Sequence, residues 1–120
     1  MKKTKRKALH RQLAPANLRV MAEYSSSGIW LVQPIGVFRH GMLDHNALGL
    51  PRELAERFTQ WIAQYEQKLF APGEFDVVTS NAEGRLLAQA LKHHVGNRHS
   101  VEFLAETVEG GLCLPEEILV

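Results

Sequence analysis

The sequence has little of what would build a disulfide, a zinc cluster or a membrane span. Its 120 residues contain one cysteine, Cys113, which excludes an intramolecular disulfide and any structural zinc site that needs several thiolates. We expect this cysteine to pack as a small, partly buried side chain. No apolar run approaches the roughly 20 residues of a membrane helix, and no apolar stretch follows the basic amino terminus as it would in a secretory signal. These absences predict a cytoplasmic protein with no place in a membrane.

Signatures of catalysis are missing as well. The chain has no glycine-rich phosphate loop and no H-E-x-x-H, C-x-x-C or G-x-S-x-G pattern. Histidine is the one catalytic residue type that occurs in groups: His40 and His45 flank Asp44, and a second group holds His93, His94 and His99. Neither group has a strong metal-ligand spacing, and His93 and His94 would point about 100° apart on a helix. We therefore predict no enzyme activity, no cofactor and no metal site, and keep a small histidine-dependent hydrolase as an alternative.

Positive and negative charge are segregated along the chain. The formal net charge is +1, but six basic residues and no acid precede residue 12: Lys2, Lys3, Lys5, Arg6, Lys7 and Arg11. From residue 12 onward, eight Lys and Arg stand against all thirteen Asp and Glu, which gives a net charge of −5. The last basic residue is Arg98, and five acids follow it: Glu102, Glu106, Glu109, Glu116 and Glu117.

This segregation suggests two kinds of partner. An acidic body can steer a cationic protein into contact, although a charge run can also be no more than a solvated surface. The basic arm can bind phosphates in a salt-dependent way, which keeps a nucleic-acid-binding regulator as a second alternative. Nucleic acid is nevertheless not the partner we expect, because the body is acidic and lacks an extended positive face. We interpret the arm as a solubilising extension or a weak electrostatic tether.

The chain length fits one domain, which we divide into a basic flexible arm at residues 1–17 and a single folded domain at residues 18–120. Alternation of apolar and polar side chains predicts a strand from Leu18 to Tyr24. A second extended run covers Ile29 to Val32, and the loop that follows has room for a further short strand around residues 35–38.

Two helices are predicted after this loop. The first is expected to run from Pro51 to about Leu69. Six apolar residues repeat there at the helical period: Leu54, Phe58, Trp61, Ile62, Tyr65 and Leu69. The spacing of Ser80 and Glu83 is that of a capping box and predicts a second helix from about residue 81, after a short extended piece at residues 75–78. A strand at residues 100–106 follows Gly96, and such a crossover would place it parallel to the first strand. The predicted fold class is therefore α+β, a small sheet with two helices packed on one face in the order β-(β)-α-α-β.

Three tracts carry a resemblance to a known family: RVMAEYSSSGIW, LGLPRELAERFTQWIAQYEQKL and SNAEGRLLAQALKHHVGNRHSVEFL. Together they resemble a family of small bacterial proteins that combines an acidic-Tyr strand end, a Trp loop, a Leu/Arg/Trp/Tyr helix, an N-x-E-G-R helix and a V-E-[YF] strand. The resemblance covers about residues 19–104. The matching positions are Glu23, Tyr24, Trp30, Leu54, Arg57, Trp61, Tyr65, Asn81, Glu83, Gly84, Arg85, Val101, Glu102 and Phe103.

These positions are of structural type, so the resemblance bears on fold more than on activity. Members are similar to proteins found beside polymorphic toxin genes, including those of contact-dependent growth inhibition, which implies an immunity protein that binds a cognate toxin domain. Toxins that attack nucleic acid are often cationic around their clefts, so an acidic inhibitor would suit them. The candidate toxin contacts are Glu102, Glu106, Glu109, Glu116 and Glu117, with Asp44 on the long loop. That loop and the tail after Glu106 depart from the family pattern and are natural places to recognise a particular partner.

Overall fold

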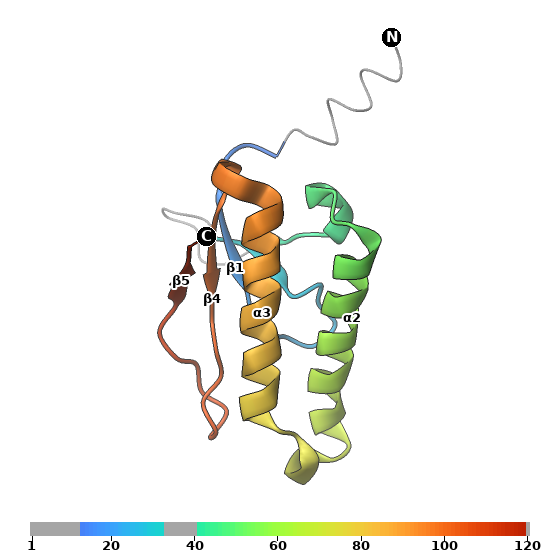
Figure 1. The fold of residues 1–120 in the computed structure, drawn as a ribbon. Helices are drawn as coiled ribbons and strands as arrows, with labels where there is room; N and C mark the ends of the chain where they lie inside the picture. Colours follow the sequence, from blue (N-terminus) through green and yellow to red (C-terminus); the bar gives the residue numbers. More distant parts are fainter. Residues whose placement is uncertain (1–12, 33–40, 120) are drawn as a thin grey trace.

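Two helices cover one face of a five-stranded sheet in the computed structural model, which describes residues 13–32 and 41–119 (Figure 1). The strands are β1 (Asn17–Val20), β2 (Ile29–Val32), β3 (Gly41–Met42), β4 (Ser100–Phe103) and β5 (Glu116–Ile118). The helices are α2 (Arg52–Glu66) and α3 (Val77–Val95), with single 3₁₀ turns η1 (His45–Leu48), η2 (Gln67–Leu69), η3 (Pro72–Glu74) and η4 (Gly96–Arg98). The predicted α+β class and the order of the predicted elements are confirmed.

The strand order is β3-β2-β1-β4-β5. At the centre, β1 pairs parallel with β4, so that Leu18 lies opposite Val101 and Val20 opposite Phe103. The parallel pairing predicted from the crossover is therefore confirmed. All other pairs in the sheet are antiparallel. The first strand of the chain thus forms the middle of the sheet, between elements from opposite halves of the sequence.

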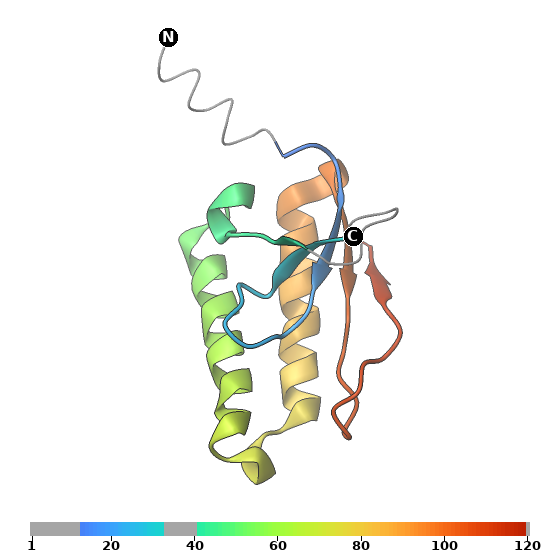
Figure 2. The same ribbon diagram turned by 180° about the vertical axis from the view of Figure 1, so that it is seen from behind.

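The core lies between the sheet and the helices because the apolar residues of each strand alternate. Leu18 and Val20 of β1 and Val101 and Phe103 of β4 are almost fully buried. Five of the six residues of the predicted helical stripe pack on them and are buried: Leu54, Phe58, Trp61, Ile62 and Tyr65. The sixth, Leu69, was predicted wrongly, because α2 ends at Glu66 and Leu69 is exposed in η2. From the opposite side of the sheet, Figure 2 shows the strands in front of both helices, with the other face of the sheet turned to the viewer.

The first strand is shorter than predicted, ending at Val20 instead of Tyr24. The chain turns there: the Met21 amide donates to the Gly28 carbonyl at 3.1 Å, and Ser25 has a positive φ of 55°. The Trp30 indole donates to the Met21 carbonyl at 3.0 Å and closes the turn from the other side. A local turn therefore overrides an alternation that continued in the sequence.

The second long helix begins four residues earlier than predicted. Its N-cap is Asp76, whose carboxylate accepts hydrogen bonds from the Thr79 amide at 3.1 Å and the Thr79 hydroxyl at 2.7 Å. Residues 77 and 78 are helical, so the predicted extended piece is wrong there, and Ser80 lies inside the helix instead of capping it. Asp76 and Thr79 have the spacing that satisfies a free amide of the first turn, and this earlier cap prevails over the later one. Gly96 ends the helix as expected.

The carboxyl-terminal residues form a strand that the sequence pattern did not predict. β5 pairs antiparallel with β4, and a bridge between Glu106 and Leu112 holds the hairpin below it. Cys113 lies on this hairpin arm and is exposed, so the expectation of a partly buried cysteine is wrong. The predicted strand at residues 35–38 lies outside the described residues. In the described part of the chain, neither helix has the length and apolarity to cross a membrane.

Candidate partner-binding surface

The six predicted contact residues lie on different parts of the molecule. Glu102 and Glu117 are cross-strand neighbours on the sheet face that points away from the helices. Glu116 is opposite Phe103, so its side chain lies on the helix side of the sheet. Glu109 lies in the β4–β5 hairpin turn, and Asp44 precedes η1 at the other edge of the fold. The structure brings Glu102 and Glu117 together and separates the others.

Three of the six predicted carboxylates form ion pairs within the protein. Glu102 pairs with Arg19 across β1 and β4. Glu106 pairs with Lys68 at 2.7 Å, and Glu116 pairs with Arg85 at 3.1 Å. Within the described part of the chain, the other three, Glu109, Glu117 and Asp44, are exposed and form no ion pair. These three carboxylates keep their charge available to a partner.

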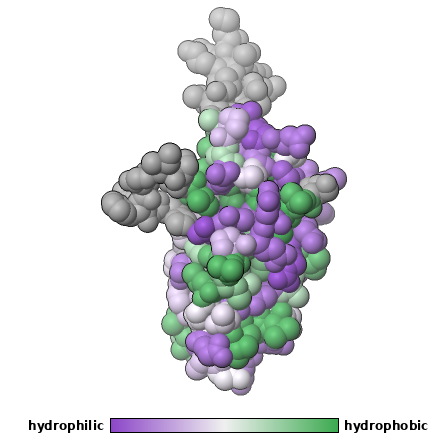
Figure 3. All heavy atoms as spheres, turned by 90° about the vertical axis from the view of Figure 1, so that its left-hand side faces the viewer, coloured by the Kyte–Doolittle hydropathy of each residue, from purple (hydrophilic) through white to green (hydrophobic). Residues whose placement is uncertain are grey.

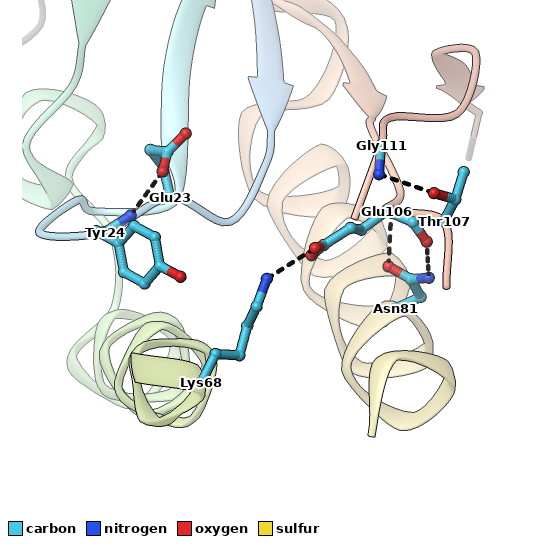
Figure 4. A network of polar contacts seen from close by, with 7 residues as sticks. All are labelled: Glu23, Tyr24, Lys68, Asn81, Glu106, Thr107 and Gly111. Carbon is cyan, nitrogen blue, oxygen red and sulfur yellow. Dashed lines mark hydrogen bonds and ion pairs between the residues drawn. The ribbon is translucent and has the colours of Figure 1, made fainter. Parts of the chain in front are cut away.

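Glu106 is the centre of a polar network that joins α2, α3 and the hairpin (Figure 4). Lys68, just after α2, extends toward its carboxylate, and both side chains are mostly buried, with 21% and 15% exposed. Asn81 of α3 holds the backbone: its amide nitrogen donates to the Glu106 carbonyl at 2.8 Å, and its carbonyl oxygen accepts from the Glu106 amide at 3.1 Å. The root of the hairpin is therefore tied to both helices.

Aromatic rings surround the Lys68 ammonium. It lies 4.2 Å from the centre of the Tyr65 ring and 5.1 Å from that of Phe75, and Tyr24 packs on Tyr65 with ring centres 5.0 Å apart. Burial lowers the pKa of Lys68, but the hydrogen bond and charge of Glu106 outweigh it, so the net shift of the pKa is upward. Burial, together with the Glu106 charge, raises the pKa of Tyr65. Lys68 thus stays charged and is engaged in cation–π contacts and an ion pair.

Hollows border this network on two sides. One of about 220 Å³ is lined by residues of the β1–β2 turn, both helices and the hairpin, among them Glu23, Tyr65, Asn81, Glu106 and Leu112. The other, of about 230 Å³, lies between the end of α2 and the start of α3. A larger hollow of about 500 Å³ lies elsewhere, between residues 13–17, the end of β2 and Arg98. The two smaller hollows therefore occur where α2 passes into α3 and β4 turns toward β5.

The N-x-E-G-R positions at the start of α3 each support the scaffold. Asn81 binds the hairpin, as described above, and Glu83 pairs with Arg57 of α2 at 3.3 Å. Gly84 leaves room for two rings: a methyl group there would lie 2.6 Å from atoms of both Trp61 and Phe103. Arg85 lies over the Phe103 ring and pairs with Glu116. The motif therefore holds helices, sheet and hairpin together.

The described histidines do not gather into one site. His45 donates from Nε2 to the Ser27 carbonyl at 3.0 Å, and His94 donates to the Leu48 carbonyl at 2.9 Å. His99 is buried and accepts a hydrogen bond from the Ala16 amide at Nδ1, and burial lowers its pKa. No group of three His, Cys, Asp or Glu side chains suited to a metal ion occurs within residues 13–32 and 41–119. His40 and the predicted basic arm as far as residue 12 lie outside the described residues.

The described body is strongly acidic, with seven Lys and Arg against thirteen Asp and Glu. All seven basic side chains are engaged. Five form ion pairs with Glu: Arg19, Arg52, Arg57, Lys68 and Arg85. Lys92 and Arg98 donate to backbone carbonyls. Basic charge is thus used internally, while several carboxylates remain on the surface.

Sequence reasoning missed the exposed apolar residues near the Glu106 network. Leu69, Phe70 and Val78 are exposed at the α2–α3 connection, and Val108 and Leu112 are exposed on the hairpin. Figure 3 shows the β5 side of the molecule, where apolar patches are separated by hydrophilic side chains. The sequence carried one signal of this surface, an apolar Leu69-Phe70 pair directly before the helix-ending Ala71-Pro72-Gly73.

The fold and the surface are those of a small α+β protein whose described body is acidic and whose motif residues build a scaffold. The sequence profile of the Serratia CdiI immunity protein-like family matches residues 16–106, and the chain belongs to that family. The match spans the central strands and both helices and ends at Glu106, where the hairpin begins. Comparisons with curated proteins and with solved structures gave no significant match.

Proposed function

We propose that this protein is an immunity protein that binds a cognate bacterial toxin domain and neutralises it by covering its active or substrate-binding site. Membership of the Serratia CdiI immunity protein-like family is the observation that carries the proposal. The acidic body adds physical support, because a toxin domain that binds nucleic acid presents cationic clefts. Inhibition of this kind is steric and electrostatic, and it asks for no reacting group in the inhibitor.

The charge distribution suits rapid capture of a basic partner. The exposed carboxylates face solvent, while the basic side chains are held by internal partners, so the potential around the described body is negative. Charge of opposite sign on a partner accelerates encounter and discriminates against wrong partners. Speed matters for an inhibitor that must reach a toxin before the toxin reaches its substrate.

The six predicted contact residues remain candidates, and their surroundings rank them. Glu109, Glu117 and Asp44 form no ion pair within the described part of the chain, so charge reversal at each of them tests a toxin contact without breaking an internal pair. Glu102, Glu106 and Glu116 already pair with Arg19, Lys68 and Arg85. Substitution of these three would disturb the fold along with any contact, so they are poorer probes of binding.

The test is a binding and protection experiment with the toxin domain encoded beside this gene. The two proteins are co-purified, titrated by calorimetry at low and at high salt, and co-expressed to measure growth. We expect a one-to-one complex, weaker at high salt, and restored growth of cells that express the toxin. A protein that neither binds nor protects would refute the proposal. Binding to DNA or RNA that is lost on removal of residues 1–11 would favour the regulator alternative.

A further inference from the structure

Exposed apolar side chains and acids gather at one end of the molecule. At this end α2 passes into α3 and β4 turns toward β5 (Figures 1 and 2). We call it the acidic–apolar end and define it by five apolar residues and four acids: Leu69, Phe70, Val78, Val108, Leu112, Glu66, Glu74, Asp76 and Glu109. Lys68–Glu106 and Asn81–Glu106 contacts tie its two halves together.

The apolar residues here are more exposed than folding requires. Phe70 is 87% exposed, Val78 70% and Leu69 64%, although all three adjoin well-packed helices. Single exposed apolar side chains are ordinary on a protein surface, but several at one end of a small domain mark an interaction site. The hollows of about 220 and 230 Å³ lie on either side and offer places where a partner side chain can insert.

The charge at this end selects the partner. Besides its four acids this end has one nearby basic residue, Lys68, and the charge of Lys68 is already paired with Glu106. The next basic residue along α3 is Arg85, eight residues from the helix start and about 12 Å up its axis. Contact with the same end of a second copy would bring like charges together, and an anionic lipid surface would be repelled. A basic protein surface with an apolar centre is complementary in both respects.

We infer that the acidic–apolar end is the surface that docks the toxin, with Phe70 as an apolar anchor in a cationic toxin surface and Glu109 on the rim. The inference rests on the proposed function and specifies its contact face. It departs from the six contacts predicted from the sequence, because five of those six lie elsewhere or are engaged in ion pairs. The sheet face that carries Glu102 and Glu117 is the competing surface.

The experiment compares four single variants of the full chain in calorimetric titrations with the adjacent-gene toxin domain. Phe70→Ser removes the proposed anchor and Glu109→Lys reverses the rim charge. Leu119→Ser is the matched control, because Leu119 is 75% exposed but lies beyond β5, away from this end. Glu117→Lys tests the competing sheet face. All four side chains are exposed, so thermal unfolding should show every variant folded.

We expect Phe70→Ser to weaken binding by about 30-fold or more, as loss of an anchor residue does. Glu109→Lys should weaken it by about 10-fold at low salt and less at high salt. Leu119→Ser and Glu117→Lys should bind like the wild type. If the wild type binds the toxin and both Phe70→Ser and Glu109→Lys bind it with the same affinity, this inference is overturned and the immunity function stands. Failure of the wild type itself to bind would remove the function, and a wild type that self-associates through this end would replace the toxin with a second copy.

Discussion

Replacement of Gly84 by alanine should destabilise the protein even though Gly84 is inside a helix. On an exposed helix, alanine in place of glycine stabilises by about 1 kcal/mol. Here the new methyl group would lie 2.6 Å from Cζ2 of Trp61 and 2.6 Å from Cε1 of Phe103. Carbon atoms prefer separations of about 3.5–4.0 Å, so both rings would have to move by about 1 Å.

Neither ring is free to move. Both side chains are almost completely buried, and the Trp61 indole donates to the Ser80 carbonyl at 2.9 Å. Overpacking of a core typically costs about 1–3 kcal/mol, and loss of the indole bond would add about 1 kcal/mol. After subtraction of the helix gain, we expect a net loss of about 2 kcal/mol and a fall of roughly 10 °C in Tm.

Urea unfolding monitored by far-UV circular dichroism measures the change. Gly73→Ala is the matched control, because Gly73 has an ordinary φ and no atom within 4 Å of the new methyl group. It should be neutral or slightly stabilising. If Gly84→Ala were as stable as the wild type or more stable, helix propensity would outweigh the ring contacts and our account of the motif glycine would be wrong.

Two further substitutions probe the hairpin root and the buried histidine. Asn81→Ala removes both hydrogen bonds to the Glu106 backbone, so unfolding free energy should fall by about 2 kcal/mol and the Glu106 amide should exchange faster with solvent; Gln89→Ala, exposed on the same helix, should change neither. Because the folded pKa of His99 lies below its ordinary value of 6.5, the unfolded state binds the proton first as pH falls, so stability is full above about pH 6.5 and is lost below it. Each unit by which the pKa is lowered contributes about 1.4 kcal/mol to the free energy of unfolding. Urea titrations at pH 7.5 and 5.5 should show this loss of stability in the wild type and in the control His93→Gln, whose side chain is exposed. The loss should be absent in His99→Gln. An unchanged loss in His99→Gln would assign the effect to other groups.

The elements that could be predicted are those whose pattern is local. The α2 stripe from Leu54 to Tyr65 repeats at the helical period and is buried as predicted, and the strand at Ile29–Val32 has the predicted bounds. The predicted start of α3 was wrong because it relied on the capping box at Ser80, whereas a second capping residue lies four residues earlier. Asp76 caps the helix, since its carboxylate reaches both the amide and the hydroxyl of Thr79. β5 carries two glutamates in three residues and exists only because β4 pairs with it.

The acidic character of the candidate surface could be read from the sequence, but its division into paired and unpaired charge could not. The partners of Glu102, Glu106 and Glu116 lie 83, 38 and 31 residues away along the chain. Such pairings depend on the register of the sheet and the length of α2. The exposed apolar end was missed for a similar reason, because it joins residues from the helix connection and the hairpin that are far apart in sequence.

The parallel pairing of β1 with β4 has a consequence for the time at which the fold can appear. These strands meet across 83 residues, and β1 has no neighbour on that side until β4 has been made. The chain must lose the entropy of closing this long loop before the strand contacts can stabilise the fold. Ribosomes add about 5–20 residues per second, so roughly 4–17 s separate the synthesis of β1 from that of β4. A nascent chain therefore lacks the β1–β4 pairing at the centre of its sheet until β4 has been synthesised, and the complete sheet cannot form before then.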